Sequence, residues 1–399
     1  MHQNIQNLVK VAEKQERLVI GLMSGTSMDG LDIALCAMKG AGKETQFELK
    51  AFKTIDYSVD FKEKILSIFS KEMVSLETLT LLNAWIGQQH GKMILSALAS
   101  WNIPSSQVDM IASHGQTIYH APKSLHPNSE YGPATLQIGD GDHIAVTTGI
   151  LTLSDFRQKH VAAGGEGAPL AVYGDYLLCS HSTENRLLLN MGGIANFTYL
   201  AAGCSLDQVF STDTGTGNTL MDAYTRTHFA PLAYDNGGAI AASGEINSNL
   251  LTALKAHSFF ALGLPKTIGP ELFNLEFLTN AQKASQTESI SSQDVMATLN
   301  RFSAETIADC IHSCLTPGTT FNMYSSGGGM HNPVLMGHLK SLLPNATLYS
   351  SDLLGINPDA KEAILFALLA NEAVAGTPLF AGGYATKIPI TMGKFSFPS

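Results

Sequence analysis

Residues 21–32 of this chain, GLMSGTSMDGLD, decide the fold because they place a glycine-rich turn between two apolar stretches. The flanking residues 18–23 (LVIGLM) and 31–39 (LDIALCAMK) have the length and apolar character of buried strands. Glycines commonly mark the bend between two paired strands. The sequence therefore predicts a β-hairpin whose turn carries hydroxyl and carboxylate side chains.

The turn of this hairpin has the chemistry of a phosphate site. Its backbone N–H groups can donate to phosphate oxygens, and its aspartates can hold Mg²⁺ directly or through water. The chain contains no GxxxxGK[ST] P-loop, and an ordinary glycine hairpin is the alternative for this segment taken alone. The candidate phosphate-binding residues are Gly25, Thr26, Ser27, Met28, Asp29, Gly30, Leu31 and Asp32.

A second segment repeats this plan. RLLLNMGG (186–193) and IANFTYLAA (194–202) form an apolar strand, a Gly192-Gly193 turn and another apolar strand. Helical periodicity, clearest over residues 76–101, alternates with strands through the rest of the chain. The pattern predicts an α/β protein of two related halves. We expect an N-terminal domain at 1–154, joined by about 380–399, and a C-terminal domain with nucleotide-binding loops at 155–379.

Two further glycine-rich loops follow apolar strands in the second half. In FSTDTGTGN (210–218), Asp213 stands at a strand end, which suits a carboxylate that acts in a cleft. An aspartate that only orders the turn is the alternative. In SSGGGMHN (325–332), the residues Gly327, Gly328 and Gly329 allow a ribose or phosphate to approach the backbone closely, with a plain loop as the alternative.

Polar residues in the first half suit a sugar. Ser113, Gln116 and Thr117 end a predicted strand, and their side chains can bind hydroxyl groups. Arg157 stands beside Asp155 and suits a substrate carboxylate. A structural, hydrogen-bonded His114 and a structural Asp–Arg pair are the alternatives at these positions.

The composition excludes several functional classes. The 399 residues are 45% apolar and 15% charged, which is typical of a well-buried globular protein with two or three domains. The net charge of −10, without a Lys/Arg run, argues against a nucleic-acid or anionic-membrane partner, and no apolar run approaches a membrane span. The N-terminus lacks a signal-peptide core. Five cysteines without a CxxC motif predict reduced thiols in a cytoplasmic protein, and two thiols at Cys310 and Cys314 seldom hold a metal.

As a set, these segments resemble the anhydro-N-acetylmuramic acid kinase family. The resemblance covers roughly residues 18–395 and is highly specific. It is carried, in the family's order and spacing, by GLMSGTSMDGLD, IASHGQTIYH, LQIGD, DFRQKHVAAGGEGAPL, LLNMGGIANFT, TDTGTGNTLMDAY, SSGGGMHN and KEAILFALLANE. It implies a fold of the hexokinase, Hsp70 and actin type: two ribonuclease H-like domains, ATP in the cleft between them, and a homodimer.

The resemblance also implies a reaction. Family members open the 1,6-anhydro ring of 1,6-anhydro-N-acetylmuramic acid with water and phosphorylate O6 with ATP and Mg²⁺. The product, N-acetylmuramate 6-phosphate, enters cell-wall recycling, and the family's catalytic aspartate matches Asp213. On this basis the turn at 25–30 and Gly192-Gly193 hold phosphates, Gly327 to Gly329 face the nucleotide, and Asp29 and Glu362 support the metal. The residues expected to face the sugar are Ser113, Gln116, Thr117 and Arg157.

The chain departs from the family pattern at several positions. His160 and Glu166 stand where the pattern DFRxxDxAAGGQGAPL has Asp and Gln. Asp140-Gly141 replaces the end of QIGNP, and KTIGPE (266–271) replaces KSTGRE, with Pro270 in place of the arginine. Two alternatives therefore stay open. One is a kinase for another 1,6-anhydro sugar such as levoglucosan, which lacks the lactyl and acetamido groups; the other is a non-catalytic nucleotide or muropeptide sensor.

Overall fold

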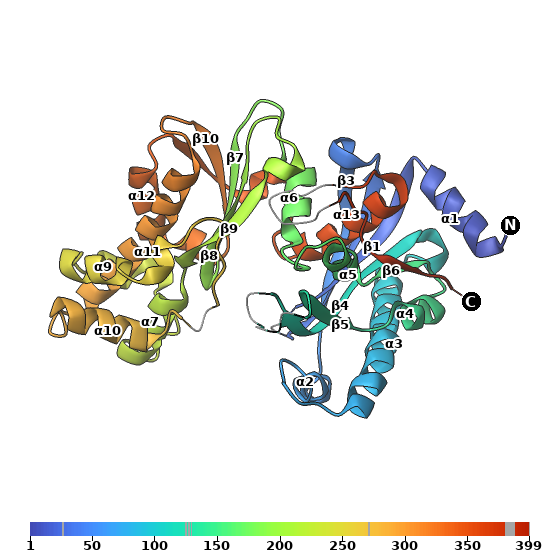
Figure 1. The fold of residues 1–399 in the computed structure, drawn as a ribbon, viewed down its shortest axis with the longest axis horizontal. Helices are drawn as coiled ribbons and strands as arrows, with labels where there is room; N and C mark the ends of the chain where they lie inside the picture. Colours follow the sequence, from blue (N-terminus) through green and yellow to red (C-terminus); the bar gives the residue numbers. More distant parts are fainter. Residues whose placement is uncertain are drawn as a thin grey trace. The chain divides into compact units, whose positions relative to one another are not determined.

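The computed structural model describes residues 1–25, 28–123, 126, 128, 130–269, 272–379 and 388–398, and the chain divides into two compact units (Figure 1). Unit 1 comprises Met1–Cys179, Ser205–Gln208 and Asp359–Ser399, and unit 2 comprises Ser180–Cys204 and Val209–Pro358. The units change over at residues 179 and 359, not at the predicted 154 and 380. The reason is that two helices, α6 (Ala171–Cys179) and α13 (Lys361–Ala375), pack with each other in unit 1.

Unit 1 is built on one mixed sheet with the strand order β12-β6-β4-β1-β2-β3, and β5 pairs with β4. Strands β1, β2 and β3 form an antiparallel meander, whereas β4 runs parallel to β1 and β6 runs parallel to β4. The strands are β1 (Glu16–Ser24), β2 (Gly30–Lys39), β3 (Gln46–Asp56), β4 (Met110–Ala121), β5 (Ala134–Ile138), β6 (Thr152–Ser154) and β12 (Lys394–Ser396). The remaining helices are α1 (Gln3–Glu13), α2 (Val59–Leu66), α3 (Leu76–Ser100), α4 (Gly141–Thr148) and α5 (Phe156–Ala162).

Helices cover the sheet of unit 1 because its central strands are apolar on both sides. Strand β1 is buried almost throughout, which is typical of a strand covered on both faces. Its residues Ile20 and Leu22 pack in a cluster with Ile86 and Ile94 of α3. Gly21 lets α13 approach very closely, since a Cβ there would lie 1.8 Å from the carbonyl oxygen of Ala363.

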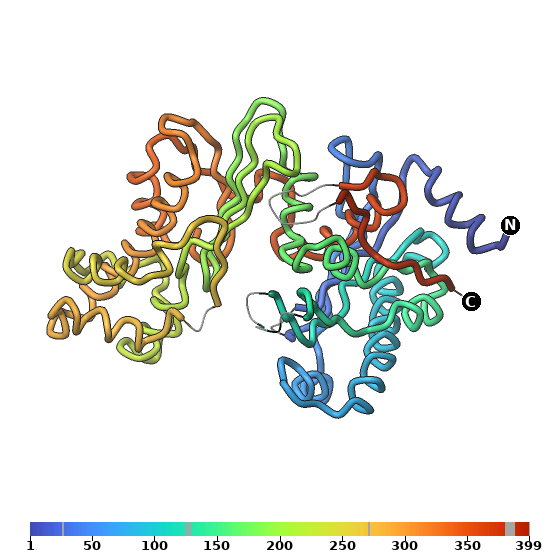
Figure 2. The backbone as a smooth tube through the Cα atoms, viewed as in Figure 1, coloured from blue at the N-terminus to red at the C-terminus, as the bar shows by residue number. Residues whose placement is uncertain are grey.

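Both chain termini belong to unit 1. Figure 2 shows the N-terminal helix α1 near the C-terminal strand β12, and the Asn4 side chain donates to the carbonyl of Pro398 at 3.1 Å. Helix α1 was not predicted, and none of its side chains is fully buried. Within the described ranges, no helix is both long enough and apolar enough to span a bilayer.

Unit 2 repeats the topology with a five-stranded sheet in the order β11-β10-β7-β8-β9. Strands β7, β8 and β9 form the antiparallel meander, and β10 and β11 continue the sheet in parallel from β7. The strands are β7 (Arg186–Met191), β8 (Ile194–Leu200), β9 (Phe210–Thr216), β10 (Phe321–Ser326) and β11 (Ala346–Ser350). The helices are α7 (Thr219–His228), α8 (Ala239–Ala242), α9 (Ser248–Lys255), α10 (Leu275–Ser285), α11 (Ser292–Cys314) and α12 (Pro333–Leu342).

Helix α11 forms the centre of unit 2. Ser291 caps it by accepting from the N–H of Asp294, and Ala304, Ile307 and Ile311 pack on the sheet cluster of β7 and β8. Phe302, also on α11, belongs to a second cluster shared with α7, α9 and α10. Both sheets thus share the order third, second, first, fourth strand of their own unit, continued by β6 and β12 in unit 1 and by β11 in unit 2. The expected α/β class and the pair of ribonuclease H-like sheets are confirmed.

Candidate functional site

The turn of the β1–β2 hairpin in unit 1 is braced from behind by buried side chains. Gln116 of β4 is fully buried, accepts from Ser24 Oγ at 2.5 Å and donates to the Gly25 carbonyl at 3.3 Å. The Gln116 side chain is therefore engaged within unit 1 and supports the turn from behind. Met28 adopts a left-handed φ of 57° and returns its N–H to Gly25 at 3.3 Å, which closes the turn. Thr26 and Ser27 lie outside the described residues.

A buried polar chain extends this brace into the core. Ser24 Oγ bonds to the hydroxyl of Tyr57 at 2.7 Å, and that hydroxyl bonds to His90 Nε2 at 2.9 Å. Burial raises the pKa of Tyr57 and lowers the pKa of His90 to about 4, so both side chains are neutral. Neither residue was predicted, because a lone histidine in a helix and a lone tyrosine after a strand carry no sequence signal of this contact.

The hairpin also presents a carboxylate close to Glu362 of α13. Thr54 Oγ1 donates to Asp32 Oδ1 at 2.6 Å, and burial raises the pKa of Asp32. Burial likewise raises the pKa of Glu362; the charge of Arg157 opposes this rise and that of Asp32 adds to it. Among the hairpin aspartates, Asp32 is therefore the electrostatic partner of Glu362. Asp29, which was expected to support the metal, accepts the Tyr57 N–H at its backbone carbonyl, 3.0 Å away.

The carboxylates of Asp32 and Glu362 suit a Mg²⁺ ion that also binds a phosphate. The described residues contain no group of three or more metal-ligating side chains. Mg²⁺ is commonly bound by one or two carboxylates, with water and substrate phosphates as its other ligands. Repulsion between Asp32 and Glu362 would be relieved by a cation. The donor set thus suits a metal shared with a phosphate, not a protein-only cage.

Arg157 of α5 is held by neutral partners. Its Nε donates to His114 Nε2 at 2.9 Å, and its Nη1 donates to the carbonyl of Gly167 at 2.6 Å. His114 Nδ1–H donates to the carbonyl of Gly115 at 2.8 Å, so Nε2 is the acceptor nitrogen. Burial, helped by the charge of Arg157, lowers the pKa of His114 to about 3. Both hydrogen-bond partners of the guanidinium are thus neutral; burial lowers the pKa of Arg157, and the charge of Glu362 opposes this effect.

The alternative of a structural Asp155–Arg157 pair is wrong. Asp155 forms its ion pair with Lys394 of β12. His160, which replaces the aspartate of the family pattern, contacts the same loop as Arg157: its Nδ1 accepts the N–H of Gly167 at 3.0 Å. Burial lowers the pKa of His160 to about 4. Gly167 thereby links His160 to Arg157.

Ser113 opens onto a polar cavity of about 350 Å³ within unit 1. Its hydroxyl is fully buried and has no hydrogen-bond partner among the described residues, as is also true of Gln137 Oε1. The walls include Asn83, Gly139, Ser154, Asp155 and Lys394. Thr117 lies further along β4 and accepts from Gln137 Nε2 at 3.2 Å. The cavity offers hydroxyl, amide and charged groups, which suit a hydroxyl-rich ligand.

In unit 2, Asp213 lies on β9 opposite Asn196 of β8 and is half-buried. The N–H of Ile268 donates to Asp213 Oδ2 at 2.8 Å, and the Asp213 N–H donates to the carbonyl of Lys266 at 2.9 Å. Burial raises the pKa of Asp213, and the Ile268 hydrogen bond opposes that rise. The backbone groups of Lys266 and Ile268 that hold Asp213 belong to KTIGPE (266–271), the segment that departs from the family pattern. Pro270 and Glu271 of this segment are outside the described residues.

The glycine loops of unit 2 meet at the end of β7. The N–H groups of Gly217 and Asn218 donate to the carbonyls of Gly193 and Gly192 at 2.7 and 2.9 Å. These first amides before α7 therefore hold the hairpin and are not open to an anion. A Cβ on Gly327 would lie 2.7 Å from the Met191 backbone, whereas one on Gly328 would meet only Asn218 Nδ2 at 3.6 Å. The close packing explains the glycine at 327, and Gly328 is the more open of the two.

A family model described as anhydro-N-acetylmuramic acid kinase matches residues 17–386. A protein named anhydro-N-acetylmuramic acid kinase from Pseudoalteromonas atlantica is 56% identical, with 100% of each chain covered. One of the same name from Caldanaerobacter subterraneus subsp. tengcongensis is 36% identical over 98% of this chain and 100% of its own.

Among solved structures, an activator of the 2-hydroxyisocaproyl-CoA dehydratase from Clostridium difficile with bound ADPNP has a TM-score of 0.38 and 10% identity, covering 90% of this chain and 95% of its own. A ROK family glucokinase from Streptomyces griseus with glucose and AMPPNP has a TM-score of 0.34 and 12% identity, covering 88% and 98%. Scores of this size carry no argument about the site. The match to the family model and the full-length relatives show that this chain belongs to the anhydro-N-acetylmuramic acid kinase family.

Proposed function

We propose that this chain uses ATP and water to convert 1,6-anhydro-N-acetylmuramic acid into N-acetylmuramate 6-phosphate and ADP, with Asp213 as the general base. Family membership supports the reaction. The observation that supports the base is the half-buried Asp213 carboxylate, one oxygen of which is held by the Ile268 N–H at 2.8 Å. A carboxylate fixed at one oxygen can present the other to a reacting proton.

The proposed reaction balances as one hydrolysis coupled to one phosphoryl transfer. Asp213 takes a proton from water while the water oxygen bonds to C1 of the sugar, and the C1–O6 bond breaks. The released O6 bonds to the γ-phosphorus of ATP, and the bond from that phosphorus to the bridging oxygen of ADP breaks. One carboxylate thus serves a hydrolysis whose leaving group is the phosphoryl acceptor.

The base must be ionised to act, and its surroundings decide at which pH that happens. Because burial raises the pKa of Asp213, protonation begins at a higher pH than for an exposed aspartate. The Ile268 hydrogen bond stabilises the ionised form and works in the opposite direction. We therefore expect activity above the pKa of Asp213 and its loss as the pH falls through that value.

Each unit supplies its own phosphate-binding loops in this proposal. In unit 1 the turn at 25–30 would donate amides to the phosphates, and Asp32 and Glu362, with Asp29 nearby in sequence, would hold Mg²⁺ against them. The ion would neutralise charge that develops on the transferring phosphoryl group. In unit 2 the Gly192-Gly193 turn and the residues Gly327 to Gly329 would receive the nucleotide.

Arg157 is the proposed partner of the lactyl carboxylate of the sugar. Its guanidinium is oriented by two neutral hydrogen-bond partners, His114 and Gly167, and an incoming carboxylate would add to the counter-charge of Glu362. Ser113 and Thr117 would bind sugar hydroxyls, and Gln116 would act through the turn that it braces.

The setting of the enzyme is also part of the proposal. All five cysteines are free thiols, which favours a reducing cytoplasm. A homodimer is implied only by the family resemblance, and sedimentation of the purified protein would test it.

The decisive experiment is turnover with product mass. We expect ATP-dependent conversion of 1,6-anhydro-N-acetylmuramic acid to a product heavier by one phosphate and one water, with one ADP per sugar. A phosphorylated product that keeps its anhydro ring would refute the coupled hydrolysis. Levoglucosan, run in competition, should be a poor substrate because it has no carboxylate for Arg157; a preference for levoglucosan would favour the other anhydro-sugar kinase. Tight binding of both substrates without ADP release would favour the sensor.

A further inference from the structure

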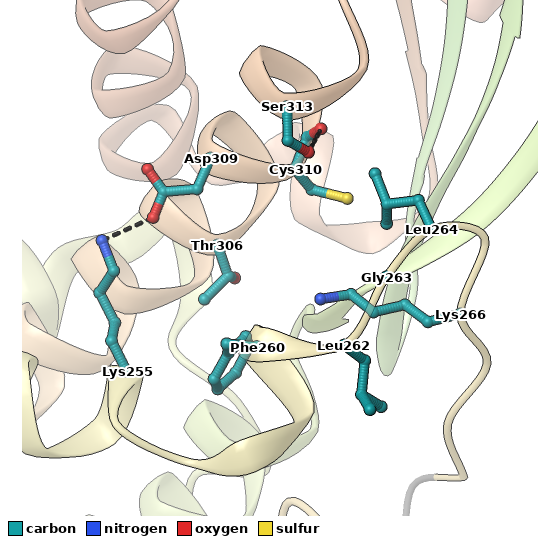
Figure 3. Close-up of a pocket in the computed structure, with 10 residues that line it drawn as sticks. All are labelled: Lys255, Phe260, Leu262, Gly263, Leu264, Lys266, Thr306, Asp309, Cys310 and Ser313. Atoms are coloured by element: carbon teal, nitrogen blue, oxygen red, sulfur yellow. Dashed lines mark hydrogen bonds and ion pairs between the residues drawn. The ribbon is translucent and has the colours of Figure 1, made fainter.

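Residues 262–268 of unit 2 lie between Asp213 and a cavity of about 390 Å³. Figure 3 shows this cavity, with Phe260, Leu264 and Lys266 on one side and Thr306 and Cys310 of α11 on the other. The Lys266 side chain points into the cavity, while its backbone faces β9. Lys266 therefore connects the cavity, through its side chain, to Asp213, through its backbone.

The backbone contacts of this segment clamp Asp213 from two directions. The Lys266 carbonyl accepts the Asp213 N–H at 2.9 Å, and the Lys266 N–H donates to Thr212 Oγ1 at 3.0 Å. Two residues later, the Ile268 N–H donates to Asp213 Oδ2 at 2.8 Å. Moving residues 266–268 away from β9 would break the hydrogen bond to the carboxylate itself.

The Lys266 ammonium anchors that backbone on two aromatic rings. Its Nζ lies 4.4 Å from the centre of the Phe259 ring and 5.6 Å from that of Phe260, and it donates to the Phe259 carbonyl at 3.2 Å. Phe260 packs in turn on Phe302 of α11 with ring centres 5.5 Å apart. The anchor is thus fixed to the core of unit 2, and cation–π contacts of this kind favour a cation over any neutral side chain.

The other charged residues that line the cavity, Lys255 and Asp309, are paired with each other. Lys255, on a different wall, forms ion pairs with Glu305 at 2.7 Å and Asp309 at 2.6 Å. No described carboxylate forms a salt bridge with Lys266. The Cys310 and Cys314 thiols are the remaining titratable groups beside it. Asp213 itself faces Asn196 of β8 and the backbone of residues 266–268.

We propose that Lys266 is a positioning residue for Asp213: its ammonium, held on Phe259 and Phe260, keeps the backbone of residues 266–268 against the carboxylate. This inference rests on the proposed function for the role of Asp213 as base. The contact between the ammonium and the rings, and its link to the Ile268 N–H, do not depend on that role.

The test compares Lys266→Met, which keeps the aliphatic stem, with Lys266→Arg, which keeps the cation. Lys255→Met is the matched control because it removes the other lysine of the same cavity. We expect Lys266→Met to lower kcat about tenfold or more, with KM for ATP and sugar changed less than about threefold. The acidic limb of its kcat/KM profile should move to higher pH, because the weakened Ile268 hydrogen bond no longer favours ionised Asp213. Lys266→Arg should restore both, and Lys255→Met should change neither.

Hydrogen–deuterium exchange separates this inference from the proposed function. The amides of Asp213 and Ile268 should exchange faster in Lys266→Met than in wild type or Lys255→Met, whether or not the protein turns over the sugar. If the wild-type protein does not turn over the sugar but exchange is still faster in Lys266→Met, the proposed reaction is refuted and the positioning link is kept.

Two results would overturn the inference: unchanged exchange in folded Lys266→Met, or an equal loss of kcat in Lys255→Met. If Lys266→Met does not fold, the same measurements on Lys266→Gln decide the question.

Discussion

The two units share the order of their first four strands but hold their key carboxylates differently. In unit 1 the carboxylate is on the second strand, where Asp32 pairs with Thr54 of the third strand and accepts its hydroxyl. In unit 2 the carboxylate is instead on the third strand, where Asp213 lies opposite Asn196 of the second strand. A side-chain hydroxyl thus restrains Asp32, whereas a backbone N–H from outside the sheet restrains Asp213.

This difference suits two kinds of chemistry. A carboxylate near a second acid, as Asp32 is near Glu362, is an attractive site for a cation. No acidic neighbour raises the pKa of Asp213, and an amide holds one of its oxygens. Such a carboxylate is better suited to accept a proton. A duplicated scaffold can therefore divide metal binding and base catalysis between its two copies.

The largest expected effect tests that division directly. Asp213→Asn should lower kcat by about 10³-fold with little change in KM for ATP, because general-base catalysis typically contributes 10²–10⁴-fold. Asp32→Asn should lower kcat by less than about 100-fold, and raised Mg²⁺ should restore part of the loss. ADP release at saturating substrates measures both variants. A greater loss in Asp32→Asn, unaffected by Mg²⁺, would reverse the two assignments.

The next effect concerns how closely a helix approaches each sheet. Gly21→Ala in β1 should destabilise unit 1 by about 3 kcal/mol or more, because its Cβ would overlap the Ala363 carbonyl and force α13 away. Gly337→Ala in α12 of unit 2 should be neutral or stabilise by up to about 1 kcal/mol, since nothing lies within 4 Å of its Cβ. Urea unfolding measures both. The two tryptophans, Trp85 and Trp101, are both in unit 1 and report its unfolding. Equal effects of the two substitutions would contradict the close α13 contact.

A smaller effect is expected at Arg157. Arg157→Lys should raise KM for the anhydro-amino sugar about 10- to 100-fold, because a lysine cannot bond to His114, to Gly167 and to a carboxylate in the same geometry. KM for ATP should stay unchanged. The same substitution should alter turnover of levoglucosan little, since that sugar lacks the carboxylate. An equal loss on both sugars would show that Arg157 acts on the fold of its loop and not on the lactyl group.

The smallest effect is a difference in acid sensitivity. Unit 1 buries His90, His114 and His160, with pKa values lowered to about 4, 3 and 4. As the pH falls, these histidines are protonated in the unfolded chain before they are protonated in the folded one. The free energy of unfolding of unit 1 is therefore at its full value above about pH 6.5 and declines as the pH falls toward 4. His90→Asn should reduce that slope by about 1.4 kcal/mol per pH unit, the contribution of one proton. Urea unfolding followed by tryptophan fluorescence at pH 6 and pH 5 measures it. An unchanged slope would mean that His90 is already protonated in the folded protein.

The sequence predicted the scaffold better than the site. Both glycine-turned hairpins and the long α3 and α13 helices follow from apolar runs, glycines and helical periodicity, and the pair of sheets follows from the family resemblance; the structure confirms all of them. The bracing chain from Ser24 through Tyr57 to His90 could not be predicted, because its members are 33 residues apart at each step and carry no shared motif. The clamp on Asp213 was also missed, since it consists of backbone groups and is independent of side-chain identity.

The order in which the chain enters its units has a consequence for synthesis on the ribosome. Unit 2 lies entirely within residues 180–358, whereas unit 1 needs α13, which begins at Lys361. All of unit 2 is therefore translated before the helix that covers β1 of unit 1 exists. A nascent chain stopped at residue 358 would contain every strand of the second sheet, while the first would still expose the apolar face that α13 later covers.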